Sequence, residues 1–395
     1  MNILSFGHIP FSEGGRQSSG LANVIYQLAY NCARQANINM TLSATDIFVP
    51  KLQKEKLTII GWTKGILLKH AIKHPFVFFK IMVDTIKNKI DYRHLESVTK
   101  LLLKKLFLDY SIKKTRPQVV HLHGALSILY LPVIPSEIKI IVTLHGNVGN
   151  DINIPNHSLY AKLERLIVES NRINTICFIA NMLETIFREE YGEIKPCTKV
   201  ILNAYDDNVF KYIEKSKHKK ITLCTIASYS ERKGQDRVIE ALIKSKCNYR
   251  YLCIGKISEE DLNRLKGQTK NLSFEWLGVK NPNEIRTILA ECDYMILPSS
   301  SEGFGLVYLE AIACGVPVII PKHLPLAMEG HILTDSNSVR IEDSSPAAIQ
   351  SVLPLLQDRK WDRKEVSESI ISYTWDNIAK EYTKLYASII KKQNK

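Results

Sequence analysis

Short apolar runs alternate with amphipathic helical patterns along nearly the whole chain. Residues 2–6 form an apolar run typical of a buried strand, and apolar residues then recur at helical spacing from Leu21 to Cys32. Strands that alternate with helices in this way predict βαβ units and a mainly parallel sheet. We therefore expect an α/β protein.

A polar and charged stretch interrupts this alternation between residues 206 and 220. The alternation restarts at Ile221 with the run Ile-Thr-Leu-Cys-Thr-Ile-Ala. The chain has 395 residues, and a single core stops growing at roughly 250–300 residues. These features predict two Rossmann-like domains, over 1–205 and 221–375, joined by a linker at 206–220.

The ends of the predicted strands are the first places to look for a functional site. In open α/β sheets, ligands bind beyond the carboxyl ends of the strands. Two Rossmann-like domains that face each other would place a shared site in the cleft between them. Residues that directly follow a predicted strand are therefore the main candidates.

One loop in the second half is especially informative. The run Ser-Ser-Ser-Glu-Gly-Phe-Gly, residues 299–305, follows a strand and leads into a short helix, residues 306–313. A glycine-flanked helix start exposes backbone N–H groups with the helix dipole behind them, which favours an anion. Glu302 and Glu310 flank this start, and carboxylates suit the hydroxyl groups of a sugar or a ribose. The combination favours a nucleotide sugar, although either glutamate alone would more often be an ordinary solvated residue.

Two adjacent cations follow the first strand of the second half. Arg232 and Lys233 precede Gly234 and an amphipathic helix. Departure of a nucleotide diphosphate leaves negative charge that must be stabilised, and Arg and Lys bind phosphate well. An Arg-Lys pair is more often part of a solvated face, but its place at a strand end favours phosphate binding.

The first half offers a second glycine loop and a histidine. The loop at 7–20 lacks GxGxxG spacing, which disfavours a dehydrogenase. Gly14 and Gly15 could let the backbone approach a phosphate, with Arg16 as an added contact, and a flexible turn is an equal alternative. His145 follows another strand, where a lone histidine is more often structural than catalytic.

No metal site is predicted. His121 and His123 have a spacing that metals can use, but no Asp or Glu ligand pattern lies nearby. The cysteines form no CxxC pair, so buried reduced thiols are expected instead of a disulfide framework or a zinc site.

The loop and helix after the second-half strand resemble a known family, the family-4 retaining glycosyltransferases of GT-B fold. Their hallmark is the run Pro-Ser-x-x-Glu-Gly-Phe-Gly-Leu-x-x-x-Glu-Ala-x-Ala-x-Gly-x-Pro-Val. This chain matches the run from Pro298 to Val318 with one extra serine in the loop. The resemblance implies that Glu302 contacts the donor sugar and that Glu310 binds the ribose hydroxyls. It also implies diphosphate contacts for three backbone amides, those of Phe304, Gly305 and Leu306.

The resemblance extends to the other candidate segments. It implies that the Gly-Gly pair at 14–15 closes over the diphosphate and that His145 lies near the donor sugar and the acceptor hydroxyl. Many family members carry Gly-Arg-Leu-x-x-x-Lys-Gly where this chain has Lys233. Ser228 stands at the position of that arginine, and we expect Arg232 to replace it.

The formal net charge of +13 favours an anionic partner. Much of the excess lies between residues 62 and 116, among apolar residues that include Phe76 and Phe79. A basic amphipathic helix with aromatic residues can lie on an anionic membrane, and ordinary helices with solvated lysines are the alternative. A basic nucleic-acid-binding protein is a rival from another class, but no recognised nucleic-acid motif is present, so we expect no nucleic-acid partner.

Taken with the resemblance, the sequence predicts a metal-independent retaining hexosyltransferase without a cofactor. It would move a sugar from a UDP- or GDP-sugar to a glycan or lipid-linked acceptor, as in O-antigen, capsule or exopolysaccharide biosynthesis. A GT-B sugar-nucleotide epimerase or phosphorylase is the nearest alternative. No signal peptide or membrane-spanning run is evident, so we expect a cytoplasmic protein that could contact the inner face of the cell membrane. The C-terminal helix, 376–395, should pack back on the first domain.

Overall fold

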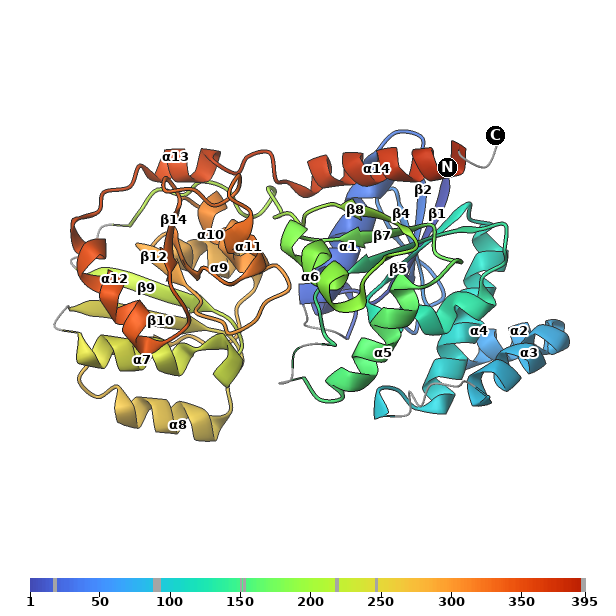
Figure 1. Cartoon of the computed structure of the whole chain (residues 1–395), viewed down its shortest axis with the longest axis horizontal. Coiled ribbons are helices and arrows are strands. Elements are labelled where there is room, and N and C mark those ends of the chain that lie inside the picture. The colour runs from blue at the N-terminus through green and yellow to red at the C-terminus, as the bar shows by residue number, and fades with distance from the viewer. Residues whose placement is uncertain are drawn as a thin grey trace. The chain divides into compact units, whose positions relative to one another are not determined.

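The computed structural model describes residues 1–16, 20–87, 94–149, 151, 154–216, 220–245 and 248–391. The chain divides into two compact units, Met1–Asn203 with Trp375–Lys395, and Ala204–Thr374. Figure 1 shows that each unit is built on a sheet flanked by helices. Parts of four predicted segments lie outside the described residues: the glycine loop (17–19), the basic stretch (88–93), the linker (217–219) and the C-terminal helix (392–395).

The sheet of the first unit has the strand order β3-β4-β2-β1-β5-β6-β7-β8. Its strands are β1 (Asn2–Gly7), β2 (Asn39–Ala44), β3 (Leu52–Lys54), β4 (Leu57–Ile60), β5 (Val119–His123), β6 (Lys139–Leu144), β7 (Thr175–Phe178) and β8 (Cys197–Val200). Neighbours pair in parallel except β3, which pairs antiparallel with β4 at the edge. The central strands are almost continuously buried, as expected for a parallel sheet covered on both faces.

Helices cover this sheet and carry the basic stretch. They are α1 (Gly20–Arg34), α2 (Lys64–Lys73), α3 (Pro75–Ile86), α4 (Val98–Thr115), α5 (His157–Val168) and α6 (Asn181–Tyr191), with short 3-10 segments η1 (Phe11–Glu13) and η3 (Ala125–Val133). Two helices of the basic stretch have side-chain N-caps. Thr63 caps α2 and Ser97 caps α4, each accepting a backbone N–H three residues on. The described part of the basic stretch therefore contains three defined helices, α2, α3 and α4.

The C-terminal helix α14 (Trp375–Lys391) belongs to the first unit. It packs on α1, where the Gln35 side chain donates to Asp376 over 2.9 Å. Further along, the Tyr386 hydroxyl lies 2.8 Å from His121 Nδ1 on β5. The helix thus reaches the buried sheet of the unit formed by the N-terminal half of the chain.

The second unit has an all-parallel sheet in the order β11-β10-β9-β12-β13-β14. Its strands are β9 (Ile221–Ile226), β10 (Tyr249–Ile254), β11 (Ser273–Trp276), β12 (Tyr294–Ile296), β13 (Val318–Pro321) and β14 (Ser338–Ile341). Its helices are α7 (Gln235–Lys244), α8 (Glu259–Gln268), α9 (Pro282–Leu289), α10 (Leu306–Ala313), α11 (Pro325–Met328), α12 (Pro346–Asp358) and α13 (Arg363–Glu368), with the 3-10 turn η4 (Glu231–Lys233). Because β9 and β12 are neighbours, their carboxyl ends meet at one edge.

The described part of the expected linker, 206–216 and 220, is assigned to the second unit. Phe210 is only 4% exposed, and the backbone N–H of Ser216 donates to the Ala290 carbonyl over 2.9 Å. The buried Phe210 side chain therefore holds part of this segment against the second unit. The segment's charged composition alone predicted a linker. Among the described residues, no helix is both long and apolar enough to cross a membrane.

Candidate active site

The loop before α10 is held in a conformation that only glycine adopts easily. Gly305 has φ +88°, and a Cβ there would lie 2.7 Å from two ring carbons of Tyr308. The chain therefore turns abruptly into α10 at Leu306. Within the described ranges, no hydrogen-bond acceptor meets the backbone N–H groups of Phe304, Gly305 or Leu306. A helix start with unpaired donors and a positive dipole end suits an anion.

Both predicted cations meet the predicted glutamate at this loop. Lys233 Nζ lies 2.5 Å from Glu302 Oε1, and Arg232 Nη1 lies 3.6 Å from the same oxygen. Ser299 Oγ donates to that oxygen as well, over 2.6 Å. The Glu302 side chain is 10% exposed, so this pair is largely shielded from water. The sheet order brings residues about seventy positions apart into one cluster.

Hydrogen bonds tie the two loops that carry this cluster together. The Ser300 N–H donates to the Arg232 carbonyl over 2.9 Å, and the Arg232 guanidinium donates to the Ser301 carbonyl over 2.6 Å. Arg237, on the first turn of α7, donates to the Pro298 carbonyl over 2.7 Å and to the Glu231 carbonyl over 2.8 Å. These contacts fix the two loops relative to each other.

Sequence reasoning missed Arg237 and Ser299. An arginine near a helix start has the same sequence pattern whether it is solvated or bridges two loops. The serine lay inside the motif, but nothing marked it as the partner of Glu302. Only the nearness of β9 and β12 reveals both roles.

Burial shifts the proton affinities of two candidate residues. Burial lowers the pKa of Lys233, and the neighbouring Glu302 carboxylate partly opposes this effect. Burial raises the pKa of Glu310 on α10 to about 7, and Asp206 adds to the shift. Lys233 is therefore easier to deprotonate than an exposed lysine, and Glu310 exists in both protonation states near neutral pH.

The glycine pair lies in the first unit, in a turn after β1. Gly14 has φ +93° and is exposed. Gly15 is buried, and a Cβ there would lie 2.0 Å from the Ile9 carbonyl oxygen. Glycine is thus required at 15 by close backbone approach and favoured at 14 by its backbone angle.

Arg16 follows this pair and has two partners. Its backbone N–H donates to the buried Asp46 carboxylate over 3.0 Å, and its guanidinium lies 4.4 Å from the centre of the Phe48 ring. Asp46 also accepts from the Ile9 N–H over 3.2 Å, so one carboxylate holds both ends of the glycine turn. Sequence reasoning missed Asp46.

His145 lines a cavity of about 390 Å³ in the first unit. The cavity opens at the carboxyl ends of β1, β5 and β6, and its lining includes His8, Leu21, Lys104, His123, His145 and Glu164. His145 Nε2 lies 3.1 Å from His123 Nδ1. Burial lowers the pKa of His145 to about 3, so its imidazole is neutral at physiological pH.

His121, one of the two histidines whose spacing a metal could use, has hydrogen-bond partners at both ring nitrogens. His121 Nδ1 bonds to the Tyr386 hydroxyl, and its Nε2 lies 2.7 Å from Thr143 Oγ1. Among the described residues there is no group of three or more His, Cys, Asp or Glu side chains placed to hold a metal ion. The histidine cluster connects β5 and β6 to α14.

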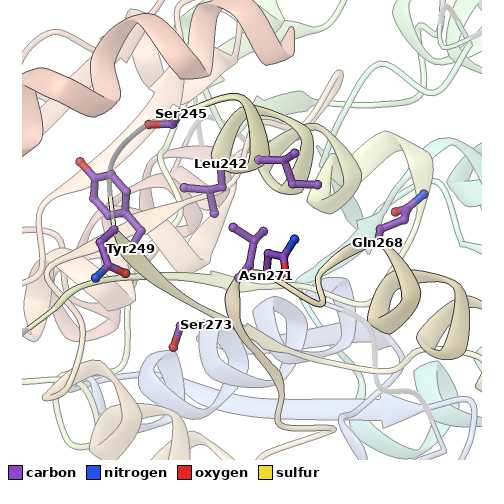
Figure 2. A pocket seen from close by; sticks show the side chains of 9 residues that line it. Leu242, Ser245, Tyr249, Gln268, Asn271 and Ser273 are labelled. Atoms are coloured by element: carbon purple, nitrogen blue, oxygen red, sulfur yellow. The ribbon is translucent and has the colours of Figure 1, made fainter.

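A further cavity lies in the second unit, with a volume of about 340 Å³ (Figure 2). Its lining includes Leu242, Ser245, Tyr249, Gln268, Asn271 and Ser273. These residues come from the starts of β10 and β11 and the ends of α7 and α8. Ligands of open parallel sheets bind at the carboxyl ends of the strands, so this cavity at the amino ends is not the candidate site.

Comparison with known proteins finds similarity to glycosyltransferases. Residues 206–354 match the family described as Glycosyl transferases group 1. An uncharacterized glycosyltransferase of Methanocaldococcus jannaschii is 27% identical over 170 residues, which cover 42% of this chain and 47% of that protein. The O-antigen biosynthesis glycosyltransferase WclY of Escherichia coli is 24% identical, over 70% of this chain and 80% of that protein. This chain thus spans about half the length of the first relative and most of the second.

Solved structures show the same fold. The sucrose-phosphate synthase of Thermosynechococcus elongatus superposes with a TM-score of 0.74 and 14% identity, over 99% of this chain and 100% of that one. At this identity the likeness speaks for the fold. Residues 206–354 thus match the glycosyl transferases group 1, and the chain as a whole has the GT-B fold.

Proposed function

We propose that the chain is a retaining glycosyltransferase that takes a sugar from a UDP- or GDP-sugar and passes it to a glycan or lipid-linked acceptor. One observation supports this most strongly. Lys233 and Arg232 converge on Glu302 beside the unpaired backbone donors at the start of α10. This places positive charge, a dipole end and a hydroxyl acceptor within one small region of the second unit.

The leaving diphosphate would be stabilised by groups of the protein. As the bond to the sugar breaks, negative charge develops on the diphosphate, and fixed donors and cations lower the barrier. Lys233, Arg232 and the amides at 304–306 supply them, which is why we propose transfer without a metal ion or cofactor. Glu302 would accept a hydrogen bond from a donor-sugar hydroxyl, and ionised Glu310 would accept from the ribose.

His145 would orient the acceptor hydroxyl in the first unit. Because the pKa of His145 is about 3, its neutral imidazole is a weak base at physiological pH. We therefore assign it hydrogen bonding to the hydroxyl instead of complete proton removal. Gly14, Gly15 and Arg16 would close over the donor diphosphate.

The acceptor belongs, in our proposal, to a surface polysaccharide. The name of the relative WclY, an O-antigen biosynthesis glycosyltransferase, supports this assignment. Lipid-linked acceptors of such pathways sit in a membrane, and we propose that the basic stretch at 62–116 brings the first unit to an anionic membrane surface. We propose no nucleic-acid partner.

The test is a screen of nucleotide sugars for released nucleoside diphosphate, with polysaccharide and lipid-linked acceptors. Glu302→Ala and Lys233→Ala should lower release by at least about 10²-fold, and Lys244→Ala, which changes an exposed lysine at the end of α7, should keep it. Unchanged turnover in both site variants would defeat the assignment. Conversion of the donor without an acceptor and without nucleotide release would favour an epimerase, and NMR of the product anomer tests retention.

A further inference from the structure

The loop that follows β6, residues 145–149, carries His145 into the cavity of the first unit. Gly146 and Val148 of the same loop also line that cavity. Nε2 of His145 faces His123, so Nδ1 is the ring nitrogen without a hydrogen-bond partner in the described part of the chain. The direction in which this ring points therefore depends on how the backbone just after it is held.

One buried carboxylate holds the backbone of this loop. Glu164, on α5, is fully buried, and its Oε1 accepts the backbone N–H of Val148 over 3.1 Å. Its Oε2 accepts the N–H of Gly149 over 3.1 Å and the Tyr191 hydroxyl over 2.9 Å. Both carboxylate oxygens are thus used within the protein, which makes Glu164 a support for the loop and not a ligand for the substrate.

Further contacts restrict the same loop. The Asn147 side chain donates to Glu190 on α6 over 3.0 Å. A Cβ at Gly149 would lie 2.5 Å from Glu164 Oε2 and 2.6 Å from the Ala161 Cα, so the loop runs directly against α5. Three consecutive residues of the loop are therefore held by α5 and α6.

The stability of the fold does not by itself explain a carboxylate at this place. Burial raises the pKa of Glu164 to about 7, although the hydrogen bonds that it accepts oppose this shift. Replacement of buried charged groups by well-packed apolar ones is often neutral or stabilising. A carboxylate, however, offers two fixed acceptors for two successive backbone N–H groups, which an apolar side chain cannot do.

We propose that Glu164 is a positioning residue for the transfer reaction, because its carboxylate fixes the loop that sets the His145 ring beside the acceptor hydroxyl. This role rests on the one proposed above for His145. Misplacement of an orienting group by about 1 Å can lower a rate about 10²-fold. Loss of these hydrogen bonds should therefore impair use of the acceptor and spare the donor, whose proposed cations and amides lie in the second unit.

The test is steady-state kinetics of two variants with the donor and acceptor found in the screen above. In Glu164→Gln one acceptor oxygen is replaced by an NH₂ group that faces a backbone N–H, so kcat/KM for the acceptor should fall about ten- to a hundredfold. Tyr191→Phe removes one hydrogen bond and keeps the two backbone contacts, so it should give a smaller loss. KM for the donor should stay close to wild type in both variants.

The matched control is Glu169→Gln, which makes the same substitution at an exposed residue at the end of α5. It should keep the acceptor kinetics of wild type. Thermal melts check folding, and Tyr191→Phe decides the matter if Glu164→Gln does not fold. An acceptor kcat/KM equal to wild type in every folded variant would overturn the positioning role.

A second measurement does not depend on turnover. The imidazole NMR signals of His145, assigned by their loss in His145→Gln, should shift in Glu164→Gln and stay in place in Glu169→Gln. An unmoved His145 signal in folded Glu164→Gln would overturn the proposal. A shifted signal in a protein that transfers no sugar would defeat the proposed function instead, and would still support Glu164 as the residue that sets the His145 ring.

Discussion

Lys233 Nζ lies 2.5 Å from Glu302 Oε1, although the two residues follow different strands of the second unit. The pair is mostly shielded, with side chains 18% and 10% exposed. Each partner therefore depends on the other for charge balance until an anion arrives. A bound diphosphate would add negative charge that Lys233 and Arg232 can share, which leaves Glu302 able to accept a sugar hydroxyl.

The first prediction concerns the lysine of this pair. Lys233→Ala should lower turnover about 10²–10³-fold, as expected for loss of one charge-stabilising donor. Lys233→Arg should recover part of it, because the charge remains while its geometry changes. Release of nucleoside diphosphate measures both, with Lys244→Ala as the control. Turnover near wild type in Lys233→Ala would exclude this lysine from catalysis.

The second prediction is a pH dependence of nucleotide binding. The pKa of Glu310 is about 7 in the ligand-free protein, and ribose hydroxyls donate to its ionised form. Affinity for nucleoside diphosphate should therefore fall as the pH drops below about 7, by up to about tenfold per unit. A phosphate group itself titrates near pH 6, so calorimetry should compare the slopes of wild type and Glu310→Gln. Equal slopes would remove Glu310 from the nucleotide site.

The third prediction concerns stability without ligand. Because the folded-state pKa of Glu310 is raised from 4.5 to about 7, the folded protein binds more protons than the unfolded chain between these values. The contribution of Glu310 to the free energy of unfolding is therefore present at low pH and lost as the pH rises from about 4.5 to about 7. Glu310→Gln should melt higher than wild type at pH 8 and close to it at pH 4.5. A lower melting temperature at pH 8 would contradict the assigned shift.

The fourth prediction concerns Arg237, which positions the loops without touching the proposed substrate. Arg237→Ala removes hydrogen bonds to the Pro298 and Glu231 carbonyls, and should cost on the order of 1–3 kcal/mol of unfolding free energy. Turnover should fall mainly through kcat, with partial rescue in Arg237→Lys. Denaturant unfolding and steady-state kinetics measure both effects. Loss of stability with kcat intact would mean that Arg237 serves the fold alone.

The fifth prediction concerns the buried histidines of the first unit. Burial lowers the pKa of His145 to about 3 and that of His123 well below its usual value. Their imidazole NMR signals should therefore not titrate between about pH 5 and pH 8, whereas an exposed histidine titrates near 6.5. Titration of His145 near pH 6.5 would restore it as a candidate general base.

The regular alternation of strands and helices predicted the two α/β units, because burial imposes that pattern on a parallel sheet. The sequence did not predict the edge hairpin of β3 and β4. The strand β3 is short and partly exposed, so it lacks the apolar run that marks a buried strand. In the segment that its charge marked as a linker, Phe210 is buried and the described residues are grouped with the second unit.

The candidate site was foreseen as separate motifs, each at a strand end. Their meeting depends on the adjacency of β9 and β12, which the sequence does not state. Ser299 supports the site through a hydrogen bond to Glu302, and Arg237 through hydrogen bonds to the Pro298 and Glu231 carbonyls. Such contacts have no periodicity, so they become visible only in three dimensions.

Calorimetric titration of the protein with UDP and with GDP tests the central claim most directly. Wild-type protein should bind one of the two at a single site, and Lys233→Ala and Glu310→Gln should each weaken that binding about tenfold or more, roughly 1.4 kcal/mol. Lys244→Ala should bind like wild type. Failure of wild type to bind either nucleotide, or unchanged affinity in both site variants, would contradict a nucleotide-sugar site at the start of α10.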